Sequence, residues 1–185
     1  MERWLLISNC QTTGLANSFN LLNQDIEVTP LDLWQFRADP ERLNASIGDY
    51  FRVVIAPELE GTEGLDLSQA QNLTRLPPVS FSAYQPDTTY AGGSGGMMNS
   101  PLDAYHSLIV IAAHRKGLSV EDTASRFNPR FIEACGYLDY WEPQKARLIA
   151  KFAEHGFDIS GRIADWSRDG AFMYTVNHPR IHVLQ

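Results

Sequence analysis

The sequence predicts an α/β fold, with a small, mostly parallel β-sheet, flanking helices and a helix-rich C-terminal half. Within residues 1–90, short apolar runs typical of buried strands alternate with helical segments, as expected for parallel strands joined by crossover helices. Residues 91–185 instead contain a series of helix start signals. The chain has 185 residues, 44% of them hydrophobic. We therefore expect one domain over residues 1–185, with a sheet-forming half and a mostly helical half.

Four apolar segments are the predicted strands. They are residues 3–8, 26–30, 52–56 and 78–82. The third is rich in β-branched residues, which favour strands. After the first strand, a helix is expected to end near Asn23. A second helix is expected to start at Asp39, a capping residue followed by Pro40 in the first turn.

The second half is expected to begin with a glycine-rich loop at residues 91–96, which includes Gly92 and Gly93. Ser100 followed by Pro101 has the residue types of a helix start. We expect a helix from Ser100 through His106 to Lys116. Further helices are predicted from Ser119, over residues 141–156 and over residues 160–169.

Composition excludes several classes of function. The net charge of −7 makes a general nucleic-acid or anionic-membrane binder unexpected. Two cysteines without CxxC spacing indicate neither a disulfide scaffold nor a structural zinc site, and we expect no metal. No signal peptide and no apolar run of membrane-spanning length is evident. We expect a soluble, cytoplasmic protein.

Cys10 is the best candidate for chemistry from the local pattern. It lies between the first predicted strand and the first predicted helix, and ligands bind at this edge of open α/β sheets. A helix N-terminus carries partial positive charge, so we expect the pKa of this thiol to be lowered. A buried structural cysteine is the competing interpretation. We expect the other cysteine, Cys135, to belong to the core.

A catalytic thiol needs a base, and His178 is the best placed of the five histidines. It lies in Asn177-His178-Pro179 near the chain end, on a segment that Pro179 keeps from being helical. His106 is the second candidate. Two simpler interpretations stay open: the segment around His178 is only a turn, and the glycine-rich loop is only a connector.

Several short motifs, taken together, resemble the WcbI family of capsule polysaccharide biosynthesis. Asn9-Cys10-Gln11 after a strand, with Gly14 following, is similar to the family's Gly-Asn-Cys-Gln signature, although Ser8 stands where the family usually has Gly. The remaining matches follow in order over nearly the whole chain: Tyr84-Gln85-Pro86-Asp87, Tyr105-His106-Ser107, Gly117-Leu118-Ser119 and Asn177-His178-Pro179.

This resemblance implies an acyl-coenzyme A-dependent O-acetyltransferase acting on a polysaccharide or its sugar precursor. Acetyl-CoA is then a substrate, and no tightly bound cofactor is expected. The implied catalytic residues are Cys10, His178, Gln11 and Asn9. The backbone N–H groups of Cys10 and Gln11, with the side-chain amide of Gln11 or Asn9, are expected to hold the oxyanion. The implied CoA-binding residues are Cys10, Gln11, Tyr84, Gly92, Gly93, His106 and Asn177.

The layout is also similar to flavodoxin-like folds and to SGNH esterases. In SGNH esterases, an acid three residues before the catalytic histidine orients the histidine ring. Here that position is Thr175, so the group that orients His178 is open. In the favoured route, His178 takes the proton of Cys10 and the thiolate forms an acyl-Cys10 intermediate. In the other route, the acetyl group passes directly to the acceptor, with His178 as base and Cys10 as a pocket wall. The sequence leaves both routes open. A cysteine-dependent carbohydrate esterase or thioesterase is the first alternative, and a non-catalytic protein that binds CoA or a glycan is the second.

Overall fold

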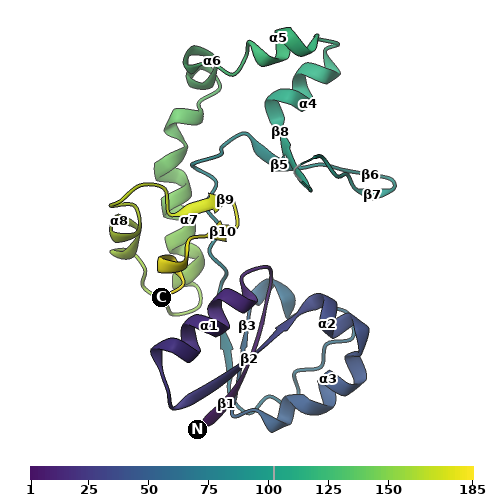
Figure 1. The fold of residues 1–185 in the computed structure, drawn as a ribbon, viewed down its shortest axis with the longest axis vertical. Coiled ribbons are helices and arrows are strands. Elements are labelled where there is room, and N and C mark those ends of the chain that lie inside the picture. The colour runs from purple at the N-terminus through teal and green to yellow at the C-terminus, as the bar shows by residue number, and fades with distance from the viewer. Residues whose placement is uncertain (102) are drawn as a thin grey trace. The chain divides into compact units, whose positions relative to one another are not determined.

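The computed structural model describes residues 1–101 and 103–185, which form two compact units (Figure 1). The first unit consists of Met1–Ser80 and Arg147–Gln185, and the second of Phe81–Ala146. Both units combine helices and strands, and the predicted α/β class is confirmed. The single domain over residues 1–185 stays a prediction.

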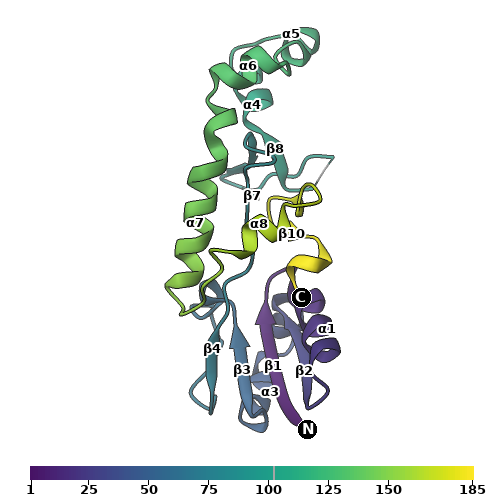
Figure 2. The ribbon, with the colours of Figure 1, turned by 90° about the vertical axis from the view of Figure 1, so that its left-hand side faces the viewer.

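A four-stranded parallel sheet forms the base of the first unit. Its order is β2-β1-β3-β4 (Figure 2). The strands are β1 (Glu2–Ser8), β2 (Ile26–Asp32), β3 (Arg52–Ile55) and β4 (Leu73–Arg75). Each neighbouring pair is parallel. The strands predicted at residues 3–8, 26–30 and 52–56 are confirmed.

Helices cover both faces of this sheet (Figure 1). They are α1 (Thr12–Leu22) on one face and α2 (Leu33–Ala38) and α3 (Pro40–Ser46) near the other, with the short turns η1 (Ile47–Asp49) and η2 (Pro57–Leu59). Successive β1 side chains alternate between the faces. Leu5 packs in a buried cluster with Phe36 of α2, whereas Leu6 packs with Ala16 of α1. The two apolar layers fix β1, and therefore the turn that follows it, between two helical layers.

The fourth predicted strand is wrong. Residues 78–82 form no regular strand, and Leu73–Arg75 pairs with β3 instead. Pro77 and Pro78 have no backbone N–H, so strand pairing cannot continue through them. Val79, just beyond, is buried, and its backbone N–H and C=O bond to a side chain rather than to a strand.

The C-terminal segment completes the first unit. The predicted long helix is α7 (Trp141–Ala153), of which the part from Arg147 onward belongs to this unit. The predicted helix over residues 160–169 is shorter, α8 (Arg162–Trp166). A hairpin of β9 (Met173–Thr175) and β10 (His178–Pro179) follows, and then η4 (Ile181–Val183). A Cβ at Gly14 of α1 would lie 2.9 Å from Leu184 Cδ1, so glycine lets this terminal segment approach α1 closely.

The second unit contains small antiparallel ribbons and short helices. The strands are β5 (Thr88–Tyr90), β6 (Gly92–Gly93), β7 (Gly96–Met97) and β8 (Tyr105–Ser107). The helices are α4 (Leu108–Arg115), α5 (Val120–Ala124), α6 (Pro129–Ala134) and η3 (Tyr137–Tyr140). The glycine-rich segment is therefore a narrow β6–β7 hairpin.

The helix predicted from Ser100 to Lys116 begins late, because its N-cap is Ser107, seven residues after Ser100. Ser107 caps α4 by accepting a hydrogen bond from the Val110 N–H, and His106 lies in β8. At the expected start, Ser100 instead forms a bridge with Asp103, which has a positive φ of 62°. Leu102 of the expected first turn lies outside the described residues. The capping pattern at Ser119 is confirmed as the N-cap of α5.

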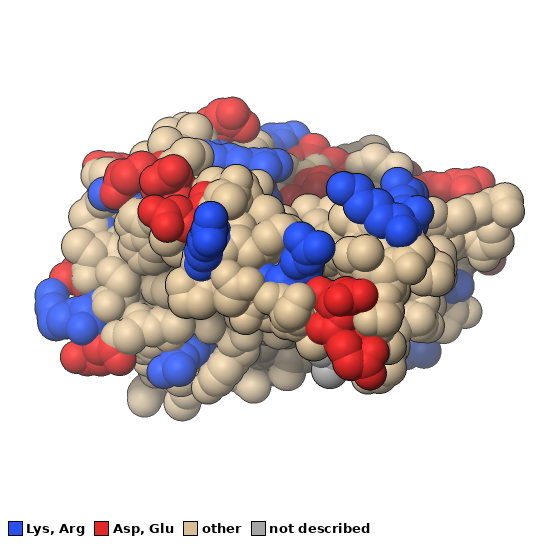
Figure 3. Space-filling view, turned by 90° about the horizontal axis from the view of Figure 1, so that it is seen from above, with Lys and Arg blue, Asp and Glu red and all other residues tan. Residues whose placement is uncertain are grey.

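Charged side chains are interspersed on the face drawn in Figure 3, with no large patch of one sign. In the described part of the chain, no helix combines the length and the apolar character needed to cross a membrane.

Candidate active site

The turn between β1 and α1 places Asn9, Cys10 and Gln11 at the carboxyl edge of the parallel sheet. The Thr12 N–H and hydroxyl both donate to the Asn9 carbonyl, at 3.0 and 2.6 Å. The Gln11 N–H donates to Asn9 Oδ1 at 3.0 Å. These bonds fix the turn, because they satisfy donors that a helix start leaves without partners.

Gln11 links three segments of the first unit. Its side chain is buried, with 4% of its surface exposed. Oε1 accepts from the Val79 N–H at 3.1 Å, and Nε2 donates to the Val79 carbonyl at 2.7 Å and to the Asn177 carbonyl at 2.9 Å. Both amide hydrogens are thus engaged. Gln11 therefore holds the site together, and its amide has no hydrogen left for an oxyanion.

The same Asn177 carbonyl lies beside Cys10. Cys10 Sγ is 3.8 Å from the Asn177 oxygen and 3.9 Å from Asn9 Oδ1. Both oxygens are acceptors, so these contacts favour the protonated thiol. The turn after β1 and the β9–β10 hairpin therefore meet at Cys10. A direct or water-bridged hydrogen bond between Cys10 and His178, which the sequence predicts, stays a prediction.

The expected lowering of the Cys10 pKa is wrong. Although the residue is exposed as a whole, partial burial of the thiol raises its pKa above the ordinary value, and the residue's own backbone N–H offsets this only in part. Loss of water around the sulfur thus raises the pKa of Cys10 by more than the N-terminus of α1 lowers it. Cys10 is a protonated thiol at neutral pH.

Cys135 also differs from its expectation as a core residue. It follows α6 and is exposed. We predict that iodoacetamide modifies Cys135 faster than Cys10 at pH 7.5, because alkylation requires thiolate and the raised pKa lowers the thiolate fraction of Cys10. The rate at Cys10 should keep rising with pH beyond the range in which an ordinary thiol ionises. Mass spectrometry of the Cys10→Ser and Cys135→Ser variants measures the two rates; faster reaction at Cys10 contradicts this assignment.

His178 follows Asn177 directly and begins β10. Its Nδ1 lies 2.6 Å from the Thr175 hydroxyl, and this hydroxyl donates to Asn177 Oδ1 at 3.3 Å. A hydroxyl donates only one hydrogen bond. In the tautomer of His178 that carries its proton on Nδ1, Thr175 donates to Asn177 and accepts from the His178 Nδ1–H. This tautomer leaves Nε2 unprotonated, as a base requires. Thr175 lies three residues before His178, and its hydroxyl is in hydrogen-bond contact with the His178 ring.

Thr175→Val should lower the rate of a reaction that uses His178 as a base by about 2- to 12-fold, the equivalent of one net hydrogen bond. Valine has nearly the same shape, so the hairpin should keep its structure. Thr175→Ser restores the hydroxyl and should restore most of the rate. The measurement is kcat as a function of pH for the three proteins; an unchanged profile in Thr175→Val would remove Thr175 from the site.

The other predicted residues lie in the second unit. The Tyr84 ring packs edge-on against Phe81 and Trp141, with centroids 5.6 and 5.5 Å apart. Gly93 pairs with Gly96 in the β6–β7 hairpin. Gly92 and His106 line one cavity of about 550 Å³, and His106 Nε2 lies 2.9 Å from the Met98 carbonyl. That these residues bind CoA stays a prediction.

Two features of the site were missed from the sequence. Val79 contributes only its backbone, which leaves no signal in its side chain. The sequence marks Thr175 only by the absence of an acid at that position, but a hydroxyl at that spacing also reaches the imidazole. Among the described residues, no group of three His, Cys, Asp or Glu side chains is placed to hold a metal ion.

Comparison with known proteins gives one family. A family model described as polysaccharide biosynthesis enzyme WcbI matches residues 3–185, nearly the whole chain. No curated protein and no solved structure matches.

Proposed function

The chain belongs to the WcbI family of polysaccharide biosynthesis enzymes, and from this membership we propose that it transfers an acetyl group from acetyl-CoA to a hydroxyl of a sugar or polysaccharide acceptor. The hydrogen bond between Thr175 and His178 is the observation that carries the proposal. This bond favours the form of His178 that can act as a base. His178 follows Asn177 directly, and the Asn177 carbonyl contacts Cys10. We also propose that the protein is cytoplasmic, as expected from the sequence.

His178 acts as the general base of the proposed reaction. Its Nε2 takes the proton of the acceptor hydroxyl while the hydroxyl oxygen attacks the thioester carbonyl of acetyl-CoA. The carbon–sulfur bond breaks, and the departing CoA sulfur takes the proton back from His178. The products are an O-acetylated acceptor and CoA, and His178 returns to its starting state.

The oxyanion of this step is held by the Cys10 backbone N–H and the Asn9 side-chain amide. The Gln11 N–H and the Gln11 amide are excluded from that role because their hydrogens are bonded to Asn9, Val79 and Asn177. Asn9 Oδ1 accepts from Gln11, which leaves Asn9 Nδ2 as its donor. Donors fixed by the protein before reaction stabilise developing charge most effectively.

The raised pKa of Cys10 supports direct transfer over an acyl-cysteine intermediate. A neutral thiol bonded to oxygen acceptors is a poor nucleophile. Cys10→Ala should therefore retain a substantial part of the transfer rate. Trapping the protein with labelled acetyl-CoA checks this: label on Cys10, together with complete loss of transfer in Cys10→Ala, would favour the acyl-enzyme route.

The cavity that contains Gly92 and His106 supports CoA binding in the second unit. His114 and Arg115 also line it, and a guanidinium and imidazoles are suitable partners for phosphate groups. The net charge of the whole chain is −7, so such local cations matter for a ligand that carries several phosphates.

The test is an activity assay with acetyl-CoA and a panel of sugars and nucleotide sugars. Acetylated acceptor, formed in step with free CoA, supports the proposal. Free acetate without added sugar would assign a hydrolase, either a carbohydrate esterase or a thioesterase. Binding of CoA or glycan with no turnover, unchanged by His178→Ala, would assign a non-catalytic role.

A further inference from the structure

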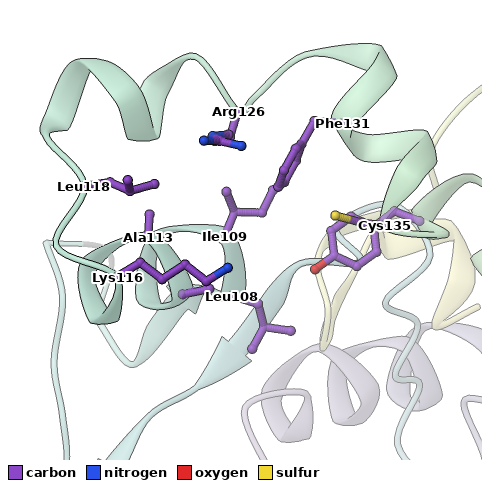
Figure 4. Close-up of a pocket in the computed structure, with 10 residues that line it drawn as sticks. Leu108, Ile109, Ala113, Lys116, Leu118, Arg126, Phe131 and Cys135 are labelled. Atoms are coloured by element: carbon purple, nitrogen blue, oxygen red, sulfur yellow. The ribbon is translucent and has the colours of Figure 1, made fainter.

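The second unit contains an apolar cavity of about 380 Å³ between α4 and α6 (Figure 4). This volume lies in the range of roughly 300–1,000 Å³ that small-molecule sites occupy. Ile109 and Ala113 of α4 form one wall, and Leu118 and Phe131 contribute others. None of the residues assigned to acetyl transfer lines it.

Helix α4 has apolar side chains on more than one side, but other residues of the second unit bury only some of them. Ile109 and Ala113 are buried, whereas Leu108, which also lines the cavity, is 44% exposed. A helix that is apolar all round is ordinarily buried. An apolar ligand in the cavity covers part of this surface and gains the free energy of its removal from water.

Two cations border the cavity. In Figure 4, Arg126 lies above it and Lys116 below it, so they face the space from opposite sides. The Arg126 guanidinium carbon is 5.5 Å from the centre of the Phe131 ring, a contact that helps to hold it there. Within residues 1–101 and 103–185, neither cation forms an ion pair, and no acidic side chain lines the cavity.

Tyr137 adds a hydrogen-bond donor. Burial raises its pKa, and Cys135, Asp87 and Tyr140 raise it further, so its hydroxyl keeps its proton at neutral pH. The cavity thus combines an apolar interior with two unpaired positive charges and one neutral donor.

We propose that this cavity binds an anionic amphiphile, an aliphatic chain that ends in a carboxylate or a phosphate. The chain lies against Ile109, Leu118 and Phe131, and the head lies within reach of Lys116 and Arg126. Long basic side chains suit this arrangement, because their aliphatic stems extend the apolar wall while their charged ends meet the head. The proposal does not depend on acetyl transfer.

Cys135 lines the cavity and provides the readout. In Cys10→Ser it is the single remaining thiol, since the chain has two cysteines. We expect decyl phosphate or decanoate, below micelle-forming concentrations, to protect Cys135 from iodoacetamide. At a ligand concentration about ten times Kd, alkylation should slow about tenfold, because only unoccupied protein reacts. Inorganic phosphate alone should give no protection, and decanol much less.

Matched variants test the charges. In the same background, Lys116→Met with Arg126→Met should abolish the advantage of the two anionic ligands over decanol. Lys145→Met, which removes a cation paired with Glu142 on α7, should leave it unchanged. Thermal unfolding of each variant checks that it is folded. Stronger protection by decyl phosphate assigns a phosphate head, and stronger protection by decanoate a carboxylate.

Three outcomes would overturn the proposal. No protection by any chain would remove the cavity as a ligand site. Equal protection by decanol and the anions would remove the anionic head. Protection that rises with protein concentration in the absence of ligand would assign the surface to contact between copies of the chain.

Discussion

Replacing His178 with alanine should lower acetyl transfer by about 10²- to 10⁴-fold, the contribution of a positioned general base. The expected loss is in kcat, because the imidazole acts on the acceptor proton during bond formation. CoA binding, measured by calorimetry, should change little, since the ring is not proposed to hold the nucleotide. The fold should also persist, because His178 lies on a hairpin rather than in either apolar layer of the sheet.

His182→Ala is the matched control. His182 lies four residues further along and is exposed, and its ring is in hydrogen-bond contact with the Trp166 carbonyl at 3.2 Å. Its loss should leave transfer within twofold of the unchanged protein, since an exposed hydrogen bond contributes little. Equal losses in the two variants would show that the His178 effect is structural.

The pH dependence of kcat gives a second test of the same role. Transfer should fall as the pH is lowered, because Nε2 must be unprotonated to accept a proton. The raised pKa of Cys10 adds nothing to this acidic limb, since its thiol is protonated throughout that range. A rate that rises only as Cys10 ionises would instead assign the reacting group to the thiolate.

Local patterns predicted the part of the fold that depends on neighbouring residues. Successive apolar residues of β1 pack alternately in the two apolar clusters on either face of the sheet. Helix α3 begins where a capping residue, Asp39, and a first-turn proline, Pro40, predict a helix start. The placement of Cys10 followed, since a turn after β1 has to lie at the carboxyl edge. The late start of α4 shows the limit: Ser100 and Ser107 are both plausible caps, and pairing of β8 with β5 decides between them.

The electrostatics of the site could not be predicted in this way. The sign of the Cys10 pKa shift depends on how much water surrounds the sulfur. One of the groups beside that sulfur, the Asn177 carbonyl, is 167 residues away in the chain. The link from Gln11 to Val79 is equally non-local and involves backbone atoms that any residue has. Such contacts exist only once the hairpin and the segment after Pro78 are in place.

Gln11→Ala should destabilise the protein by about 2–4 kcal/mol, because each buried backbone group left without a partner costs roughly 1–3 kcal/mol and water replaces some of the lost bonds. The groups affected are the Val79 N–H and C=O and the Asn177 C=O. For a chain of this length the expected fall in Tm is about 4–16 °C. Gln69→Ala is the control, since Gln69 is exposed and should change Tm very little.

Gln11→Glu keeps the side-chain volume and removes the two hydrogen bonds that the Gln11 amide donates, so it tests the effect of those bonds alone. The carboxylate still accepts from the Val79 N–H but faces the Val79 and Asn177 carbonyls with no hydrogen to donate. Burial beside two oxygens raises the folded-state pKa of this glutamate above its unfolded value, so its stability contribution is greatest when it is protonated and is lost as pH rises. We expect Gln11→Glu to unfold at a lower Tm at pH 8 than at pH 5, relative to the unchanged protein at each pH. A variant as stable as the parent at pH 8 would show that Gln11 does not join β1, Val79 and the His178 hairpin.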